Sequence, residues 1–173
     1  MSFSMKATIR AFVAPKHRLV CPTRLWYQIL AELARRGKQR HESGVFLLGV
    51  SRGEYRHVQD AIFYDDLDPD AYSSGVCVLH GEAFAKLWAV CREKKLTVVA
   101  DAHTHPAGAF QSSSDKENPM VARAGHIAII IPNFARAPVQ ARAMRIYEYC
   151  GEHDWIDRSP KTVPGFLYTG LWS

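Results

Sequence analysis

Residues 96–115, LTVVADAHTHPAGAFQSSSD, change from an apolar run to a polar turn in the middle of the stretch. The first ten residues are rich in β-branched side chains and predict a strand over 96–105. Pro106 and Gly108 then turn the chain out of the sheet, and serines lead on to Asp115. The stretch therefore predicts a sheet in which one strand ends in a group of polar side chains.

Two amphipathic helices precede this strand and are predicted over 22–37, where Pro22 suits the first turn, and over 81–95. Their apolar side chains recur at helical spacing and are Trp26, Ile29, Leu30 and Leu33 in the first helix and Phe84, Leu87, Trp88 and Cys91 in the second. An acidic loop is predicted over 65–75, and further strands over 6–13, 17–21, 44–50, 54–64, 76–80, 126–132, 140–150 and 154–157. Strands mixed with two long helices predict an α/β or α+β fold.

The length of the chain bounds its organisation. With 173 residues, 47% of them hydrophobic, the chain can bury one core and is short for two, so residues 1–173 are expected to form one domain. Its longest apolar runs, within 45–50 and 127–131, fall far short of the roughly 20 residues of a membrane span. The first 20 residues hold no apolar stretch typical of a secretory signal. We therefore expect a soluble, cytoplasmic protein with no membrane partner.

The cysteines and the net charge argue against further classes of protein. The four cysteines, Cys21, Cys77, Cys91 and Cys150, lie far apart without a C-x-x-C pair, which argues against a disulfide framework and a cysteine zinc site. They are expected to be small apolar core groups. The net charge of +5 is modest and is spread along the chain, apart from a basic run at 35–41. A nucleic-acid partner is therefore not supported.

His103 and His105 are the first candidate metal ligands. Alternate side chains of a strand share a face, so the two imidazoles should point the same way from Cα atoms roughly 6.5–7 Å apart. Pro106 favours an extended backbone at His105, and Asp115, after nine intervening residues, can return as a third ligand. Two histidines and one carboxylate suit zinc and leave a fourth position for water, which a nearby carboxylate can deprotonate.

A simpler interpretation exists for each part of this pattern. An isolated H-x-H is common in proteins without a metal. Ser112 and Asp115 also have the spacing of a helix capping box, and Ser114 with Glu117 offers a second one in an overlapping register. The metal interpretation gains from the whole string, because H-x-H-P, a glycine turn and S-x-x-D in succession are far rarer than any one of them.

The complete pattern resembles the JAMM, or MPN-plus, family of zinc metalloproteases. That family combines an upstream glutamate between the first helix and the next strand with H-x-H-P and a following S-x-x-D. The corresponding segments are ESGVFLLG at 42–49, HTHP at 103–106 and SSSD at 112–115, and GHIAIIIPNF at 125–134 resembles the strand after the metal loop in bacterial members. The resemblance covers about residues 22–157. The sequence departs from the family in having nine rather than ten residues between His105 and Asp115.

The resemblance implies an MPN-type fold, which is an α/β fold related to cytidine deaminases, with a mixed, curved sheet flanked by helices. It implies that His103, His105 and Asp115 bind Zn²⁺ and that Glu42 activates the water in the fourth position. Ser112 would stabilise the oxyanion that forms when this water attacks a carbonyl. Without the resemblance, Glu42 would be taken for an exposed charge after a helix.

Asp101 is a further candidate that rests on strand alternation alone. It should share a face with His103 and His105, and could accept a hydrogen bond from a ligand histidine. A solvated carboxylate at a strand end, or a partner for a nearby arginine, is the competing interpretation. If Asp101 supports a ligand, replacing it with asparagine should weaken zinc retention.

The resemblance implies that the activity is hydrolysis of the amide at the C-terminus of a ubiquitin-like protein or its conjugate. The sequence looks like stand-alone bacterial members of the family, some of which act beside bacterial ubiquitin-like conjugation systems. One alternative is release of a small amine from the C-terminus of a sulfur-carrier protein. Another is an MPN scaffold without catalysis, although retention of all five site residues argues against it. Zinc deaminases need H-x-E and P-C-x-x-C, which the sequence lacks. A thiol protease is disfavoured because Cys77 and Cys91 are predicted core residues.

Overall fold

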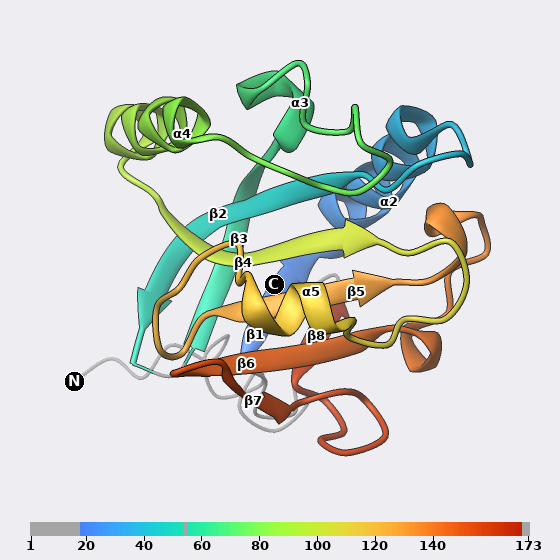
Figure 1. Ribbon diagram of the computed structural model, residues 1–173. Helices are drawn as coiled ribbons and strands as arrows, with labels where there is room; N and C mark the ends of the chain where they lie inside the picture. Colours follow the sequence, from blue (N-terminus) through green and yellow to red (C-terminus); the bar gives the residue numbers. More distant parts are fainter. Residues whose placement is uncertain (1–17, 54, 171–173) are drawn as a thin grey trace.

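The structure is a computed structural model that describes residues 18–53 and 55–170 (Figure 1). A mixed, curled sheet of eight strands has the order β7-β6-β5-β4-β2-β3-β1-β8. The strands are β1 (Leu19–Pro22), β2 (Gly44–Arg52), β3 (Tyr55–Phe63), β4 (Thr97–Thr104), β5 (Ile127–Ile131), β6 (Arg145–Gly151), β7 (Asp154–Asp157) and β8 (Leu167–Gly170). The helices are α2 (Thr23–Gly37), α3 (Tyr64–Leu67), α4 (Gly81–Lys94) and α5 (Ser113–Glu117), with short 3-10 helices η1 (Asn133–Ala135) and η2 (Ala141–Ala143).

Two apolar clusters lie on opposite faces of β2. Because successive side chains of a strand alternate, Val45 and Leu47 pack in the cluster that contains the buried residues of α2, whereas Phe46 and Leu48 pack in the cluster beside α3 and α4. All four side chains are fully buried. Because both faces of β2 are buried, its sequence is a continuous apolar run and does not alternate between apolar and polar residues.

The long helices confirm the prediction in outline. In α2 the predicted stripe of Trp26, Ile29, Leu30 and Leu33 is buried, and Pro22 occupies the N-cap position immediately before the first turn. In α4 the buried residues are Ala83, Leu87 and Cys91, while Trp88 is 39% exposed. The predicted stripe of α4 is therefore wrong at Trp88, because the helix packs on the sheet through a narrower face.

Two predicted segments differ from the structure. The predicted loop over 65–75 begins as the short helix α3, which buries Tyr64 and Leu67. The strand predicted over 76–80 is wrong: the segment pairs with no strand of the sheet. Its backbone is instead held locally, since the Val78 N–H donates to the Ala71 carbonyl at 2.9 Å. Apolar alternation predicted an extended backbone here, but it could not show whether a neighbouring strand would pair with it.

The remaining predicted strands correspond to elements of the sheet, with shifts of a few residues at their ends. The strand predicted over 6–13 lies outside the described residues. No strand was predicted where the structure has β8, which pairs in parallel with β1 at the edge of the sheet. Within the described residues, no helix combines the length and the apolar character needed to span a bilayer.

The end of β4 is tied directly to the segment that connects α2 with β2. The Thr104 N–H donates to the Ser43 carbonyl at 2.9 Å, and the Ser43 N–H donates to the Thr104 hydroxyl at 3.0 Å. The Ser43 hydroxyl in turn donates to the Leu33 carbonyl in α2 at 2.9 Å. These bonds place Glu42, the residue before Ser43, beside the histidines at the end of β4.

Candidate metal centre

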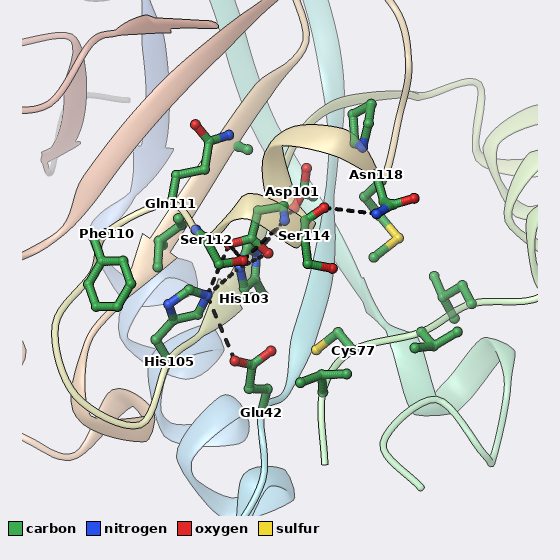
Figure 2. A pocket seen from close by; sticks show the side chains of 18 of the residues that line it. Glu42, Cys77, Asp101, His103, His105, Phe110, Gln111, Ser112, Ser114 and Asn118 are labelled. Carbon is green, nitrogen blue, oxygen red and sulfur yellow. Dashed lines mark hydrogen bonds and ion pairs between the residues drawn. The ribbon is translucent and has the colours of Figure 1, made fainter. Parts of the chain in front are cut away.

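The structure brings the three predicted metal ligands His103, His105 and Asp115 together at the end of β4. Figure 2 shows the two histidines with Ser112 and Glu42 beside them. The Nε2 atoms of His103 and His105 are 3.0 Å apart. Asp115 Oδ1 lies 3.5 Å from the Nε2 atom of His103, and Asp115 Oδ2 lies 3.4 Å from that of His105. Both histidines are buried, with exposed fractions of 8% and 5%.

Backbone pairing fixes the two histidines. His103 lies in β4 between Gly44 of β2 and Ile130 of β5, so strand pairs on both sides hold its backbone. His105 follows the strand, and its N–H donates to the Ile131 carbonyl at 2.9 Å. The sheet geometry thus continues to His105, which puts both imidazoles on one face as alternation predicted.

Asp115 is oriented by the N-terminal cap of α5. The Ser112 hydroxyl donates to Asp115 Oδ2 at 2.7 Å and accepts the Asp115 N–H at 3.1 Å, while the Ser112 N–H donates to the same Oδ2 at 2.8 Å. The predicted capping box is confirmed in the Ser112 register rather than the Ser114 register. Because the Ser112 hydroxyl and the Ser112 N–H both donate to Oδ2, the cap leaves Oδ1 directed at His103.

Glu42 faces the cluster from the opposite side. Its Oε1 lies 3.8 Å from His105 Nε2, its N–H donates to the Gly75 carbonyl at 3.0 Å, and its carboxylate accepts the N–H of Cys77. Burial raises the pKa of Glu42, and the neighbouring His103 and His105 offset only part of this effect. The carboxylate therefore has a stronger affinity for a proton than an ordinary surface glutamate.

The charges around the histidines favour a cation at this place. Burial lowers the pKa of His103, but the neighbouring Asp101 and Asp115 carboxylates outweigh this effect and raise the pKa to about 10. Burial raises the pKa of Asp115, yet His103, His105 and Ser112 hold it well below its usual range. The two Nε2 atoms are 3.0 Å apart, and each lies 3.4–3.5 Å from a different oxygen of Asp115, which is close to the separation of roughly 3.3–3.4 Å between donors around one tetrahedral zinc ion. The residues present fit a divalent cation.

These ligands lie in a cavity of about 680 Å³ that Glu42, His103, His105 and Asp115 line with polar atoms. Apolar side chains line the rest of the cavity, among them Val76, Val78, Leu79, Phe84, Phe110, Met120 and Trp155. Phe110 is 65% exposed and Val76 is 49% exposed. The cavity can therefore accept an extended ligand with apolar side chains and bring one of its polar groups to the cluster.

Cys77 lies in this cavity as well as against the core cluster next to α4, where the sequence predicted a core residue only. Burial, with the nearby Glu42, Asp101 and Asp115 charges, raises the pKa of its thiol well above the usual range. A thiol that stays protonated is a poor nucleophile, which argues against a cysteine protease.

The partners of Asp101 are His126 and Tyr64, which sequence reasoning missed. Asp101 is 2% exposed, its Oδ1 lies 2.6 Å from His126 Nε2, and its Oδ2 accepts the Tyr64 hydroxyl at 3.2 Å. The interpretation of Asp101 as a solvated carboxylate is therefore wrong. His126 immediately precedes β5, and only the parallel pairing of β5 with β4 could have placed it beside Asp101.

Comparisons with known proteins agree with this site. No family model matches the chain. The "Probable metalloprotease y4jG" of Sinorhizobium fredii is 26% identical over 144 residues, which are 83% of this chain and 85% of that protein. The chain is thus a distant homologue of a probable metalloprotease, and its His103, His105 and Asp115 cluster is consistent with a JAMM motif.

Solved structures share the fold. The solution structure of protein DSY2949 from Desulfitobacterium hafniense superposes with a TM-score of 0.62 at 17% identity, covering 88% of this chain and 94% of that one. A protein from Salinibacter ruber has a TM-score of 0.49 at 19% identity, covering 75% and 84%. The first of these similarities supports the mixed α/β architecture described above and says nothing of activity.

Proposed function

We propose that this protein is a zinc-dependent JAMM-type metalloprotease with an MPN-type fold, formed by residues 1–173 as one domain. Its substrate is the amide bond at the C-terminus of a ubiquitin-like protein. The observation that carries the proposal is the convergence of Glu42 with His103, His105 and Asp115 in one cavity. This combination supplies three ligands and a separate base, as metal-assisted hydrolysis requires.

In the proposed mechanism His103, His105 and Asp115 hold the metal ion. When bound, the ion supplies a Lewis acid that makes water a nucleophile at neutral pH. Glu42 accepts the proton of the attacking water and delivers it to the nitrogen of the leaving amine. Its raised pKa suits a group that must first take a proton and then give it up. The cavity walls hold the substrate amide between Glu42 and the ligands.

Ser112 has two roles in this proposal that compete for one proton. Its hydroxyl proton is donated to Asp115 Oδ2 at 2.7 Å, which orients a ligand. To stabilise an oxyanion, as the family resemblance implies, the hydroxyl must turn away from Oδ2. The Ser112 N–H would still hold Asp115, because it also donates to Oδ2.

Replacing Ser112 with alanine separates these roles. The loss of the cap should lower the free energy of unfolding by about 1 kcal/mol. If Ser112 serves the oxyanion, kcat should also fall by about 100-fold in fully metal-loaded protein. Thermal unfolding, metal titration and steady-state kinetics measure the three quantities. Loss of metal affinity with an unchanged kcat at saturating metal would limit Ser112 to orienting Asp115.

The segment over 76–79 supports an extended peptide as the substrate. It pairs with no strand among the described residues, and Val76 and Val78 expose 49% and 42% of their surface beside the cluster. A flexible C-terminal tail can lie along such a segment, gain main-chain hydrogen bonds and deliver its last carbonyl to the metal. A ubiquitin-like protein offers a folded body for the surrounding surface and a tail of this kind.

The proposal is tested by incubating the zinc-loaded protein with several ubiquitin-like proteins and weighing the products by intact mass spectrometry. Each substrate carries at its C-terminus a peptide extension, an isopeptide-linked lysine or a small amine. We expect cleavage directly after the tail and complete loss of cleavage with a chelator. Release of only the small amine would favour a sulfur-carrier substrate. No cleavage by protein shown to contain zinc would contradict the proposed activity.

A further inference from the structure

Three buried polar side chains lie next to His103, and one of them, Asp101, also lines the cavity. Asp101, His126 and Tyr64 are 2%, 7% and 0% exposed. Two groups hold the Asp101 carboxylate: His126 Nε2 at 2.6 Å from Oδ1 and the Tyr64 hydroxyl at 3.2 Å from Oδ2. Burying a carboxylate is costly unless donors satisfy it, so this arrangement requires all three side chains together.

Three separate elements assemble the trio. Asp101 lies in β4, His126 immediately precedes β5, and Tyr64 begins α3. Gly44 of β2 makes room for the Tyr64 ring, because a Cβ atom there would lie 2.1 Å from the ring. Gly44 is also the register partner of His103. The same strand pair therefore positions both the ligand histidine and the tyrosine that reaches Asp101.

Asp101 faces the nitrogen of His103 that lies away from the metal ligands. Asp101 Oδ2 is 3.9 Å from His103 Nδ1, while His103 Nε2 is the atom near His105 and Asp115. His126 and Tyr64 hold the Asp101 carboxylate with Oδ2 on the side of His103 Nδ1. A carboxylate oxygen on this side attracts an N–H from His103 and leaves Nε2 with a free lone pair.

We propose that Asp101, His126 and Tyr64 are positioning residues for the metal ligand His103. His126 and Tyr64 fix the rotation of the Asp101 carboxylate so that Oδ2 faces Nδ1. His103 is thereby held as the tautomer with its proton on Nδ1, and Nε2 is presented to the cation. This inference rests on the metal centre of the proposed function but not on the proposed substrate.

Zinc affinity of four variants, measured by competition with a chromophoric chelator, tests the proposal. We expect Asp101→Asn to bind zinc about 10–100-fold more weakly. His126→Leu removes the donor to Asp101 and should weaken binding in the same direction, whereas His126→Gln keeps an N–H donor and should recover much of the affinity. Asp157→Asn is the control, because Asp157 also accepts a hydrogen bond, from the Ser159 N–H at 2.7 Å, but does not line the cavity.

Nitrogen NMR of the histidine rings in the zinc-loaded proteins separates a positioning role from a purely structural one, because a purely structural role would leave the ring signals unchanged. The wild-type His103 ring should carry its proton on Nδ1 and exchange it slowly with water. In Asp101→Asn and His126→Leu this proton should exchange faster. Circular dichroism reports whether each variant is folded, and if Asp101→Asn does not fold, the comparison of His126→Leu with His126→Gln decides.

Different results overturn different conclusions. Wild-type protein that binds zinc, together with folded variants of unchanged zinc affinity and ring signals, would overturn the positioning role and leave the metal centre intact. Variants that lose thermal stability but keep their zinc affinity and ring signals would also overturn the positioning role. Wild-type protein that binds no zinc would overturn both the metal centre and the role of Asp101.

Discussion

His103→Ala is expected to remove the bound metal and the hydrolytic activity together. His103 offers one of the three proposed ligand atoms, and its Nε2 lies 3.0 Å from that of His105 and 3.5 Å from Asp115 Oδ1. Removing it leaves one nitrogen and one carboxylate, which cannot complete a zinc site. The metal affinity should therefore fall by more than the roughly 10–100-fold that a supporting residue costs. Elemental analysis after dialysis and initial rates measure both losses.

The matched control is His80→Ala, which also removes an imidazole. His80 is exposed at the N-terminus of α4, makes no capping hydrogen bond and does not line the cavity. It should keep one equivalent of metal and the full rate. If His103→Ala kept the metal and the rate as well, the cluster would not be the metal centre, and the hydrolase proposal would fail with it.

Local signals in the sequence predicted that His103, His105 and Asp115 lie together, because the geometry that joins them is local. Strand alternation alone places His103 and His105 on one face, and the spacing of a capping box places Ser112 against Asp115. The structure has both features. The family resemblance added Glu42, which spacing could not relate to the histidines because they lie about 60 residues further along the chain. The hydrogen bond between Ser43 and Thr104 brings these two segments of the chain together.

Features that depend on distant partners could not be predicted in this way. The apolar alternation over 76–80 is genuine, but pairing depends on which strands come near, and no strand of the described residues pairs with this segment. The environment of Asp101 depends on His126 and Tyr64, which reach it from two other elements. A sequence pattern indicates on which face of its strand a side chain lies, whereas its partner on a neighbouring strand depends on the order of the strands in the sheet.

The same difference between local and long-range contacts applies to the residues of the candidate site. The proposed ligands come from β4, the residue directly after Thr104 and the first turn of α5, so the strand and the cap of α5 hold them in place without a metal. The proposed base, Glu42, comes from the connection between α2 and β2 and is held by the backbone N–H of Cys77, in the segment next to the cavity. Movement of that segment on substrate binding would therefore reach Glu42 first and leave the metal ligands in place.

Glu42→Gln is expected to retain the metal and lose about 100-fold or more in kcat, because general base catalysis contributes typically 10²–10⁴-fold. The amide has nearly the same shape as the carboxylate, and its oxygen can still accept the Cys77 N–H, but it cannot take a proton from water. Rates measured at a confirmed metal content of one equivalent separate this effect from loss of metal. Glu32→Gln, which replaces an exposed glutamate paired with Arg35 on α2, should keep the full rate.

The comparison with His103→Ala makes the test of Glu42 specific. A scaffold that only binds partners would tolerate both substitutions in every assay, whereas a metal-dependent hydrolase should lose activity in both but metal in only one. If Glu42→Gln also released the metal, Glu42 would be a ligand rather than the base, and its Oε1, 3.8 Å from His105 Nε2, is close enough for a small movement to bring it there. Full metal with full activity would show that another group takes the proton, and Glu42 would then serve only to hold the Cys77 segment beside the cavity.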